Sequence, residues 1–582
     1  MPKAFKDEHG QYTSSTNKML DMLTSYMEDV YNVHQREDLP SMIQNFQEKY
    51  SQTMEDMSAS CHLPQLTFQQ VWEFAQTRSP SRAAGMDAWG MDELLHLPPS
   101  GWIGFTMTML LAEETGQWPL VLKFISLSAI GKGTDIKSPK DTRCIGVSSC
   151  VYSVWSGLRF RHLIPWMLRV FPSNIIGGVP ERHMFESEAQ LSLDIRDFQT
   201  EPLLVLLDRV KCFDRIVPAV AVSALNSLGL PPPIGVAIQG FYSNQVRIMK
   251  LGKAFGKRLI HGSSALQGCT LSILMVNGIF SVLMAHLNKT CPQVQATTFI
   301  DDMKVWAKRE NIGMLQSALA ETVEFDRLTG QLISEEKTTV VSRREKQRRR
   351  FLIQVGRTYK SKSNAKSLGN VHRADKKRAA VTQDQRANKA VATLQKIAQL
   401  PLCNTQKALH IKTNAHPQWL HGTEFQIPSK RALARFTTHV VKIFANRLKR
   451  IRSPWLFLAT YEDVFIDPFA ALAKQLLVKI RALAWTHPEL ATKVLKEAAL
   501  VQRTVEQTNN GLAAVLAFVC NSLGWTLNSE EPFYITTTPQ GNGFCIKGGS
   551  KSFLVEELDH ACRNFLLNQV PERQIGRASC RE

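Results

Sequence analysis

An apolar run that ends in an acid, followed farther along the chain by a pair of acids between two short strands, constrains this sequence most. Leu203–Leu207 is continuously apolar, as in a buried strand, and Asp208 follows it directly. Residues 294–300 and 303–307 have the pattern of two strands joined by a tight turn at Asp301 and Asp302. Because two adjacent carboxylates repel each other, a hairpin tip made of them requires a cation nearby.

These three carboxylates can form one cation site. A strand end beside a hairpin tip can bring Asp208, Asp301 and Asp302 together, and Mg²⁺ prefers a few carboxylates together with substrate phosphates. Two such ions about 4 Å apart can activate a hydroxyl and stabilise the leaving oxygen of a phosphoryl displacement. Taken singly, each acid has a plainer interpretation as a surface turn or a capping residue.

The charge of the chain is concentrated in one block. The 582 residues include 70 Lys and Arg and 51 Asp and Glu, a net charge of +19. Residues 341–452 hold 27 basic and 4 acidic side chains, so the rest of the chain has a net charge of −4. We expect this block to bind phosphates, with a solvated charged face as the alternative. Its first part, residues 343–350, also has the composition of a nuclear localisation signal.

Cysteine usage and hydropathy limit the environment of the chain. The eleven cysteines are widely spaced and form no C-x-x-C, which favours reduced thiols in an intracellular protein over a disulfide framework or a zinc ribbon. The N-terminus has no signal-peptide core, and the apolar stretches 102–112 and 511–525 are too short and interrupted to span a bilayer. We therefore expect no membrane partner and a location in the nucleus or cytoplasm.

Short motifs around the three acids occur in a recognisable order. Together they resemble the G-x-D and R-P-I segments of the fingers, the three palm motifs, the glycine-to-lysine segment and the L-G grip motif of reverse transcriptases. Each is weak alone, but seven in the family's order and approximate spacing are specific. The segments are residues 84–87, 141–145, 206–215, 266–272, 299–302, 329–338 and 366–369.

Two further segments resemble LINE-type (non-LTR) retrotransposon polymerases in particular. Residues 6–10, followed by a predicted amphipathic helix over Thr16–Tyr31, are similar to the segment before their fingers, and residues 416–424 are similar to a recurrent thumb stretch. The resemblance covers residues 5–452. It implies an RNA-directed DNA polymerase that acts on an RNA template, a DNA primer or target site and dNTPs.

The resemblance also implies an α/β fold of the right-hand polymerase type, with fingers, palm and a helical, basic thumb. We expect six segments along the chain. They are a pre-fingers helical segment (1–65), fingers (66–200), palm with the catalytic motifs (201–340), basic connector and helical thumb (341–500), an uncharacterised C-terminal region (501–574) and a terminal stretch (575–582) that back-translates to a sequencing adapter and is expected to be an artefact.

Position within the motifs implies the catalytic roles. Asp208 and Asp301 would hold two Mg²⁺ ions, or Mn²⁺, with Asp302 in support. Phe213 would be the sugar gate, because an aromatic ring there clashes with a ribose 2′-hydroxyl. Lys337 would stabilise the leaving pyrophosphate or act as general acid. The plainer alternatives are a core phenylalanine and a solvated lysine.

Four more residues would bind the nucleotide or the template. Gln267 and Gly268 would touch both, since a residue without a Cβ allows close approach of the backbone. Arg143 would bind the triphosphate through its guanidinium fork, and Lys132 is a second candidate for the same task.

The basic block supplies the predicted nucleic-acid contacts. A helix predicted over residues 432–452 would pack through Phe436 and Phe444 and track the duplex with its basic face. Contacts to the phosphate backbone give affinity without sequence readout and make it steeply salt-dependent. The expected contact residues are Arg348, Arg349, Arg350, Lys442, Arg447, Lys449 and Arg450.

Several positions depart from the family pattern. Phe299 and Ile300 stand where Tyr and Ala are commoner, and Thr270, Ile273 and Cys144 stand where prolines are usual. All metal carboxylates are retained, so the departures bear on fidelity and activity more than on fold. Two alternatives stay open: an RNA-directed RNA polymerase, against which the aromatic gate argues, and an inactive retroelement-derived RNA-binding protein. No endonuclease or RNase H segment is recognisable, and we expect a fragment of a longer reading frame or a decaying copy.

Overall fold

The chain forms two compact units. The computed structural model describes residues 2–7, 9–32, 38–133, 135–197, 199–259, 264–375, 380–444, 453–504 and 510–570. Unit 1 comprises Met1–His183 and Leu207–Thr338, and unit 2 comprises Met184–Leu206 and Thr339–Glu582. The units therefore cut across the expected borders of fingers and palm, because residues 184–206 pack with the C-terminal half of the chain.

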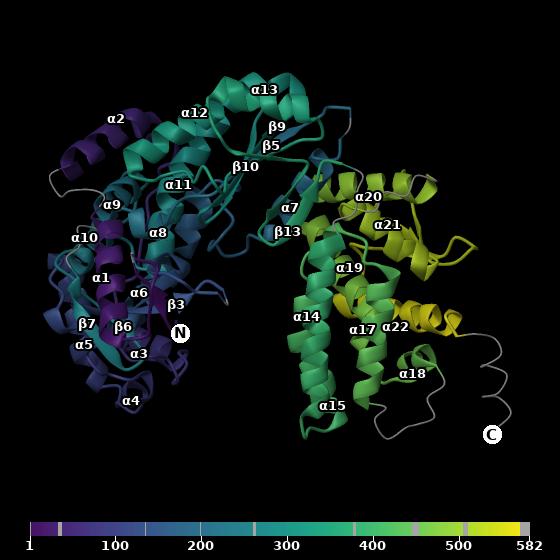
Figure 1. The fold of residues 1–582 in the computed structure, drawn as a ribbon, viewed down its shortest axis with the longest axis horizontal. Coiled ribbons are helices and arrows are strands. Elements are labelled where there is room, and N and C mark those ends of the chain that lie inside the picture. The colour runs from purple at the N-terminus through teal and green to yellow at the C-terminus, as the bar shows by residue number, and fades with distance from the viewer. Residues whose placement is uncertain are drawn as a thin grey trace. The chain divides into compact units, whose positions relative to one another are not determined.

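Unit 1 is built on a four-stranded sheet of order β4-β3-β6-β7 and also contains the β8–β9 hairpin (Figure 1). Strand β3 pairs antiparallel with β4 and parallel with β6, and α1 packs against β6 and β7. The elements are β1 (Phe5–Lys6), β2 (Tyr12–Thr13), α1 (Thr16–Tyr31), α2 (Leu39–Met57), α3 (Phe68–Gln76), α4 (Met91–Leu95), α5 (Gly101–Thr115), β3 (Phe124–Gly131), β4 (Thr142–Val147), α6 (Cys150–Val170), α8 (Cys212–Arg215), α9 (Pro218–Ser227), α10 (Pro232–Tyr242), β6 (Val246–Leu251), β7 (Ala254–Leu259), α11 (Thr270–Thr290), β8 (Gln295–Phe299), β9 (Asp302–Ala307) and α12 (Ile312–Thr329).

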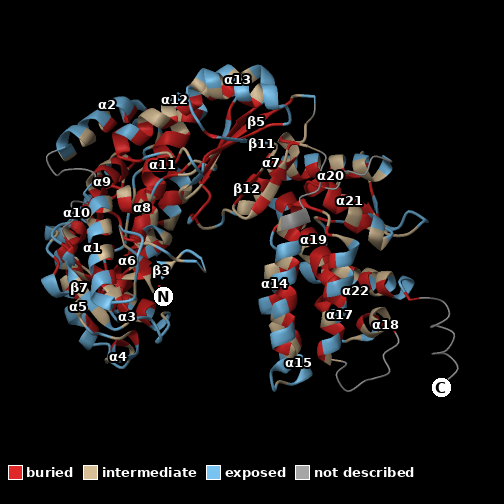
Figure 2. Cartoon of the chain, viewed as in Figure 1, coloured by how far each residue is buried: buried red, intermediate tan, exposed pale blue. Residues whose placement is uncertain are grey.

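Helix α11 is the central core helix of unit 1 (Figure 2). Phe280 on this helix lies 5.5 Å, between ring centroids, from Phe325 on α12, which in turn contacts Phe46 of α2 at 6.1 Å. By length and composition, α11 is the one helix in the described part of the chain that could cross a membrane. Because 78% of its apolar window is buried, the core explains that composition.

Unit 2 is mainly helical and has one continuous apolar core (Figure 2). Helices α14, α17, α19, α20, α21 and α22 all contribute to it, so the C-terminal region that the sequence left unassigned belongs to the core of this unit. The elements are α7 (Met184–Asp194), β5 (Leu203–Leu207), β10 (Thr339–Val341), α13 (Glu345–Val355), β11 (Lys360–Lys362), β12 (Asn364–Ser367), β13 (Asn370–Arg373), α14 (Ala380–Gln399), α15 (Asn404–His410), α16 (His416–Leu420), α17 (Lys430–Phe444), α18 (Pro454–Thr460), α19 (Pro468–Thr486), α20 (Pro488–Arg503), α21 (Leu512–Leu523), β14 (Thr526–Leu527), β15 (Tyr534–Thr536), β16 (Gly543–Cys545) and α22 (Lys551–Asn568).

The structure contains the predicted elements, with one turn displaced by a single residue. The helix over Thr16–Tyr31 and the strand Leu203–Leu207 are confirmed as α1 and β5. The predicted helix 432–452 is observed as α17 up to Phe444, while residues 445–452, with Arg447, Lys449 and Arg450, lie outside the described residues, as do residues 575–582. The predicted hairpin turn was wrong by one position, because Asp302 pairs with Phe299 as the first residue of β9.

Candidate active site

The segment after β5 places the first acid of the cavity. The backbone carbonyl of Asp208 accepts the Ser334 N–H at 2.8 Å, and the Val210 N–H donates to the Leu332 carbonyl at 2.9 Å. These bonds hold residues 208–210 against the loop that follows α12. Lys337 lies on the same loop, and its Nζ forms an ion pair with Asp208 Oδ1 at 3.1 Å. The loop thus supplies a positive charge directly to the first acid.

The turn of the β8–β9 hairpin places the second acid, and it is strained. The turn residues are Ile300 and Asp301, and Ile300 has φ +59°, a left-handed conformation that a β-branched residue rarely adopts. Its carbonyl accepts a hydrogen bond from Thr298 Oγ1 at 2.7 Å. A Cβ at Gly177 would lie 2.7 Å from the Ile300 nitrogen, so only glycine permits this close approach of the neighbouring backbone.

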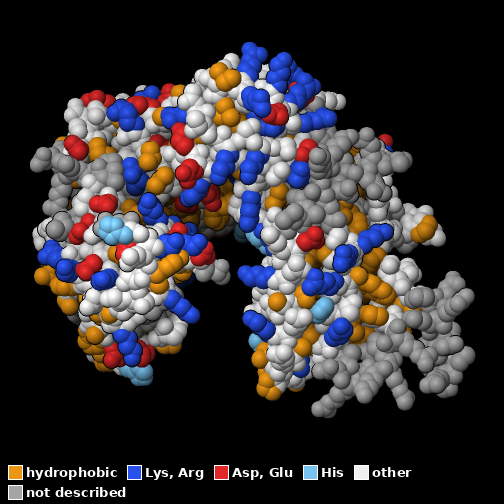
Figure 3. Space-filling view, viewed as in Figure 1, with side chains coloured by type: hydrophobic (Ala, Val, Ile, Leu, Met, Phe, Trp, Pro, Cys, Tyr) orange, Lys and Arg blue, Asp and Glu red, His pale blue; other side chains and the backbone are white. Residues whose placement is uncertain are grey.

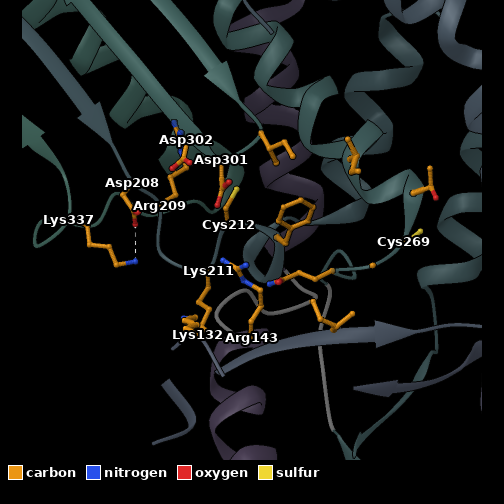
Figure 4. Close-up of a pocket in the computed structure, with 17 residues that line it drawn as sticks. Lys132, Arg143, Asp208, Arg209, Lys211, Cys212, Cys269, Asp301, Asp302 and Lys337 are labelled. Atoms are coloured by element: carbon orange, nitrogen blue, oxygen red, sulfur yellow. Dashed lines mark hydrogen bonds and ion pairs between the residues drawn. The ribbon is translucent and has the colours of Figure 1, made fainter. Parts of the chain in front are cut away.

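The acids of the cavity carry an excess of negative charge. Burial, followed by the charges of Asp301 and Asp208, raises the pKa of Asp302 to about 6, although the residue as a whole is exposed. Burial also raises the pKa of Asp301, and the charge of Asp208 adds to this rise. Figure 4 shows the three carboxylates side by side at one wall of the cavity.

Basic side chains also line this cavity, which has a volume of about 610 Å³. Lys132, Arg143 and Lys211 lie across from the acids in Figure 4. Lys132 Nζ donates to the Lys140 carbonyl at 3.1 Å, and Lys211 Nζ donates to the Thr142 carbonyl at 3.3 Å. Burial, together with the charges of Lys211, Lys337 and Arg143, lowers the pKa of Lys132. Like charges held this close favour an anionic ligand between them.

The predicted nucleotide-binding residues line the same cavity. Phe213 lies on α8, a single helical turn, and is half-buried. Gly268 has φ +114°, and a Cβ there would meet the Gly146 carbonyl oxygen at 2.7 Å, so the turn requires glycine. The Gly146 N–H donates to the Gln267 carbonyl at 2.7 Å, which docks this turn on β4. The structure thus brings Asp208, Asp301, Asp302, Lys337, Phe213, Arg143, Lys132, Gln267 and Gly268 together.

The sequence did not identify three further residues that line the cavity or lie next to its lining. Lys211 lines the cavity and starts α8 with φ +52°. Arg209 is buried and forms an ion pair with Asp326 of α12, Nε to Oδ1, at 3.0 Å. Asp214 is buried beneath the cavity and accepts from Gln267. The sequence signal for these residues was a charged side chain inside or next to an apolar run. That signal does not identify the partner, because Arg209 and Asp214 each pair with a residue more than 50 positions away in the chain.

The comparison with known families points to the same residues. Residues 131–370 match the family model of the reverse transcriptase (RNA-dependent DNA polymerase), a range that contains every residue lining the cavity. This part of the chain is a reverse transcriptase domain. It marks the protein as an RNA-directed DNA polymerase, a nucleotidyltransferase, and confirms that part of the sequence resemblance. No curated protein matches the chain.

Two of the expected nucleic-acid contacts are exposed on α13, which lies inside the matched range, but one is not. Arg349 and Arg350 are exposed, and Figure 3 shows basic side chains gathered over this helix. Arg348 is buried: its guanidinium donates to Ser361 Oγ at 2.9 Å and to the Ser342 carbonyl at 2.5 Å. Arg348 therefore stabilises unit 2 internally, which corrects its assignment as a phosphate contact. Lys442 on α17 is exposed.

Divalent metal ions are the general cofactors of reverse transcriptases, and the cavity fits them. Asp208, Asp301 and Asp302 offer the hard oxygen donors that Mg²⁺ prefers. Burial, with the charges of the neighbouring carboxylates in addition, raises the pKa of Asp301 and Asp302. In the described residues no group of three or more His, Cys, Asp or Glu is already arranged as a metal cage. Mg²⁺ often takes only one or two protein carboxylates and completes its shell with water and substrate phosphates, so such a site agrees with the chemistry.

Proposed function

We propose that the domain is the polymerase of a LINE-type (non-LTR) retrotransposon, which copies RNA into DNA by two-metal nucleotidyl transfer. The observation that carries the proposal is one cavity with three clustered carboxylates and five basic side chains, in a domain of this family. The subtype is supported by the sequence resemblance of residues 6–10 and 416–424.

The chain's own residues hold the reactants. Arg143, Lys132 and Lys211 bind the triphosphate of the incoming dNTP, because several fixed cations compensate its charge. Two Mg²⁺ ions held by Asp208 and Asp301, with Asp302 in support, would activate the primer 3′-hydroxyl and stabilise the leaving oxygen. Most of the catalytic gain is then positioning and charge stabilisation.

Selection and product release are assigned to two other side chains. Phe213 excludes the ribose 2′-hydroxyl and so favours dNTPs. Lys337 exchanges its contact with Asp208 for the leaving pyrophosphate, as charge stabiliser or general acid.

The basic surface of unit 2 binds the nucleic acid. Arg349 and Arg350 on α13, and Lys442 on α17, contact phosphates of the template and of the DNA primer or target, without sequence readout. Residues 343–350 also act as a nuclear localisation signal, so the protein works in the nucleus as well as the cytoplasm.

Primer extension on an RNA template with Mg²⁺ and dNTPs tests the proposal. We expect the wild type to extend the primer, and Asp301→Ala/Asp302→Ala to bind the template but add nothing. Extension with NTPs in preference to dNTPs would identify an RNA-directed RNA polymerase instead. Retained RNA binding without extension in the wild type would identify an inactive binding protein.

A further inference from the structure

A buried carboxylate follows the proposed sugar gate in the chain. Asp214 follows Phe213 on α8 and is 2% exposed. Burial raises its pKa to about 6, while the charges of Lys211 and Arg247 oppose this rise. A charged group is costly at such a depth unless it is paired and hydrogen-bonded, so a position like this usually serves a purpose.

Asp214 determines which way the Gln267 side chain faces. Gln267 Nε2 donates to Asp214 Oδ2 at 3.1 Å. An ionised carboxylate only accepts hydrogen bonds, so the amide NH₂ must face it. The amide carbonyl oxygen of Gln267 is then the polar group that this cavity-lining residue offers to a ligand.

A second buried layer supports Asp214 from behind. Arg247 on β6 is fully buried and acts on Asp214 through its charge. Its guanidinium donates to Gln245 Oε1 at 3.0 Å and to the Ser264 carbonyl at 2.7 Å, and lies 5.0 Å from the ring of Tyr31 on α1. Because these bonds hold the guanidinium of Arg247, the positive charge that acts on Asp214 is fixed in place independently of any ligand.

We propose that Asp214 is a positioning residue for nucleotide selection. Its bond to the Gln267 amide fixes the acceptor that Gln267 presents to the incoming nucleotide, and the same bond ties α8, the turn that carries Phe213, to the segment around Gln267. The inference rests on the proposed function, because it takes the cavity as the dNTP site. It goes beyond that function by assigning selectivity to a side chain that does not touch the nucleotide.

Single-nucleotide incorporation by the full chain tests this. Asp214→Asn keeps the shape but lets the new amide donate, so Gln267 can turn its NH₂ toward the nucleotide. We expect the KM for dNTP to rise roughly tenfold to a hundredfold, as for loss of a hydrogen bond to a charged group. Discrimination against NTPs should fall, with a smaller change in kcat. Gln267→Met should have a similar effect, and the double variant should be no worse than the worse single variant.

Gln267→Glu provides a readout that does not depend on how well Asp214→Asn folds. A glutamate can donate to Asp214 only when one carboxyl is protonated, so its KM deficit relative to the wild type should shrink as the pH falls through about 6. The titratable and charged groups that act on Asp214 are Lys211 and Cys212 beside it, Arg247 on β6, Lys132, Cys144 on β4, and Tyr26 and Tyr31 on α1.

The matched control is Asp467→Asn, a buried carboxylate that caps α19 in unit 2, which should leave KM and discrimination unchanged. Additive effects of Asp214→Asn and Gln267→Met, or a pH-independent deficit in Gln267→Glu, would overturn the inference. If Phe213→Ala does not relax discrimination, the sugar-gate assignment is wrong, whereas the coupling between Asp214 and Gln267 is still measured through KM.

Discussion

The cavity of unit 1 and the helical core of unit 2 both contain carboxylates, but they surround them differently. In unit 2, Asp467 accepts hydrogen bonds from Thr437 Oγ1 at 3.1 Å and from the backbone N–H groups of Phe469 and Ala470 at 2.9 and 3.0 Å. In unit 1, Asp301 and Asp302 lie beside Asp208. The charge of Asp208 acts on both of them, and the charge of Asp301 also acts on Asp302.

This difference separates carboxylates that stabilise the fold from carboxylates that are arranged to bind a ligand. Bonds from the protein stabilise a buried carboxylate such as Asp467, so it serves the structure. Clustered carboxylates cost stability, and they persist where a substrate or cation compensates them. Backbone strain follows the same division, because Ile300 at φ +59° lies at the cavity.

Removal of one cavity acid should have the largest effect and should separate activity from stability. We expect Asp301→Asn to lower kcat by on the order of 10³-fold, as for loss of a group that stabilises charge in the transition state. The midpoint of thermal unfolding should stay constant or rise, because repulsion within the cluster falls. Single-turnover extension and calorimetry measure the two effects. Marked destabilisation by this variant would mean that Asp301 is structural.

A truncation in the core of unit 2 should show the opposite pattern. Leu516 on α21 is fully buried, and Leu516→Ala should lower the free energy of unfolding by about 2–5 kcal/mol. The kcat of the folded fraction should not change at low temperature. Urea titration with parallel activity assays tests this, and loss of activity without loss of stability would place the C-terminal region in the catalytic machinery.

The pH dependence of stability should reveal the buried acid of unit 2. Burial raises the pKa of Asp467 to about 6, above the value of 3.8 expected when the chain is unfolded. The folded state therefore holds an extra proton between these values. The contribution of this proton to the free energy of unfolding is complete below pH 4 and is lost as the pH rises through 6. Each tenfold difference in proton affinity between the folded and unfolded states corresponds to about 1.4 kcal/mol. Urea titrations from pH 4 to 7 should show that Asp467→Asn flattens this slope, and an unchanged slope in this variant would contradict the prediction.

Relief of the strained turn should have the smallest effect. Asn adopts the left-handed region more readily than Ile, so Ile300→Asn should raise the free energy of unfolding by up to about 1 kcal/mol. Extension activity should fall severalfold if the strain helps to aim Asp301. Unchanged activity together with raised stability would show that the strain is incidental.

Much of the site was predictable because its signals are local. The apolar run before Asp208, the short motifs in their order and the glycine at position 268 can each be read within a few residues. The turn of the β8–β9 hairpin was misplaced, because the alternation of apolar and polar residues does not show which backbone groups pair. Asp302 belongs to β9 because it pairs with Phe299.

The sequence alone determined the match of residues 131–370 to the reverse transcriptase family, the three acids and the basic block, since composition and short-range order encode them. Tertiary structure decided which charges meet: Arg348 is buried in unit 2 rather than exposed, Arg209 pairs with Asp326, and Asp214 holds Gln267. The physical reason is that the energy of a buried polar group depends on its partner, and folding brings that partner from a distant part of the chain.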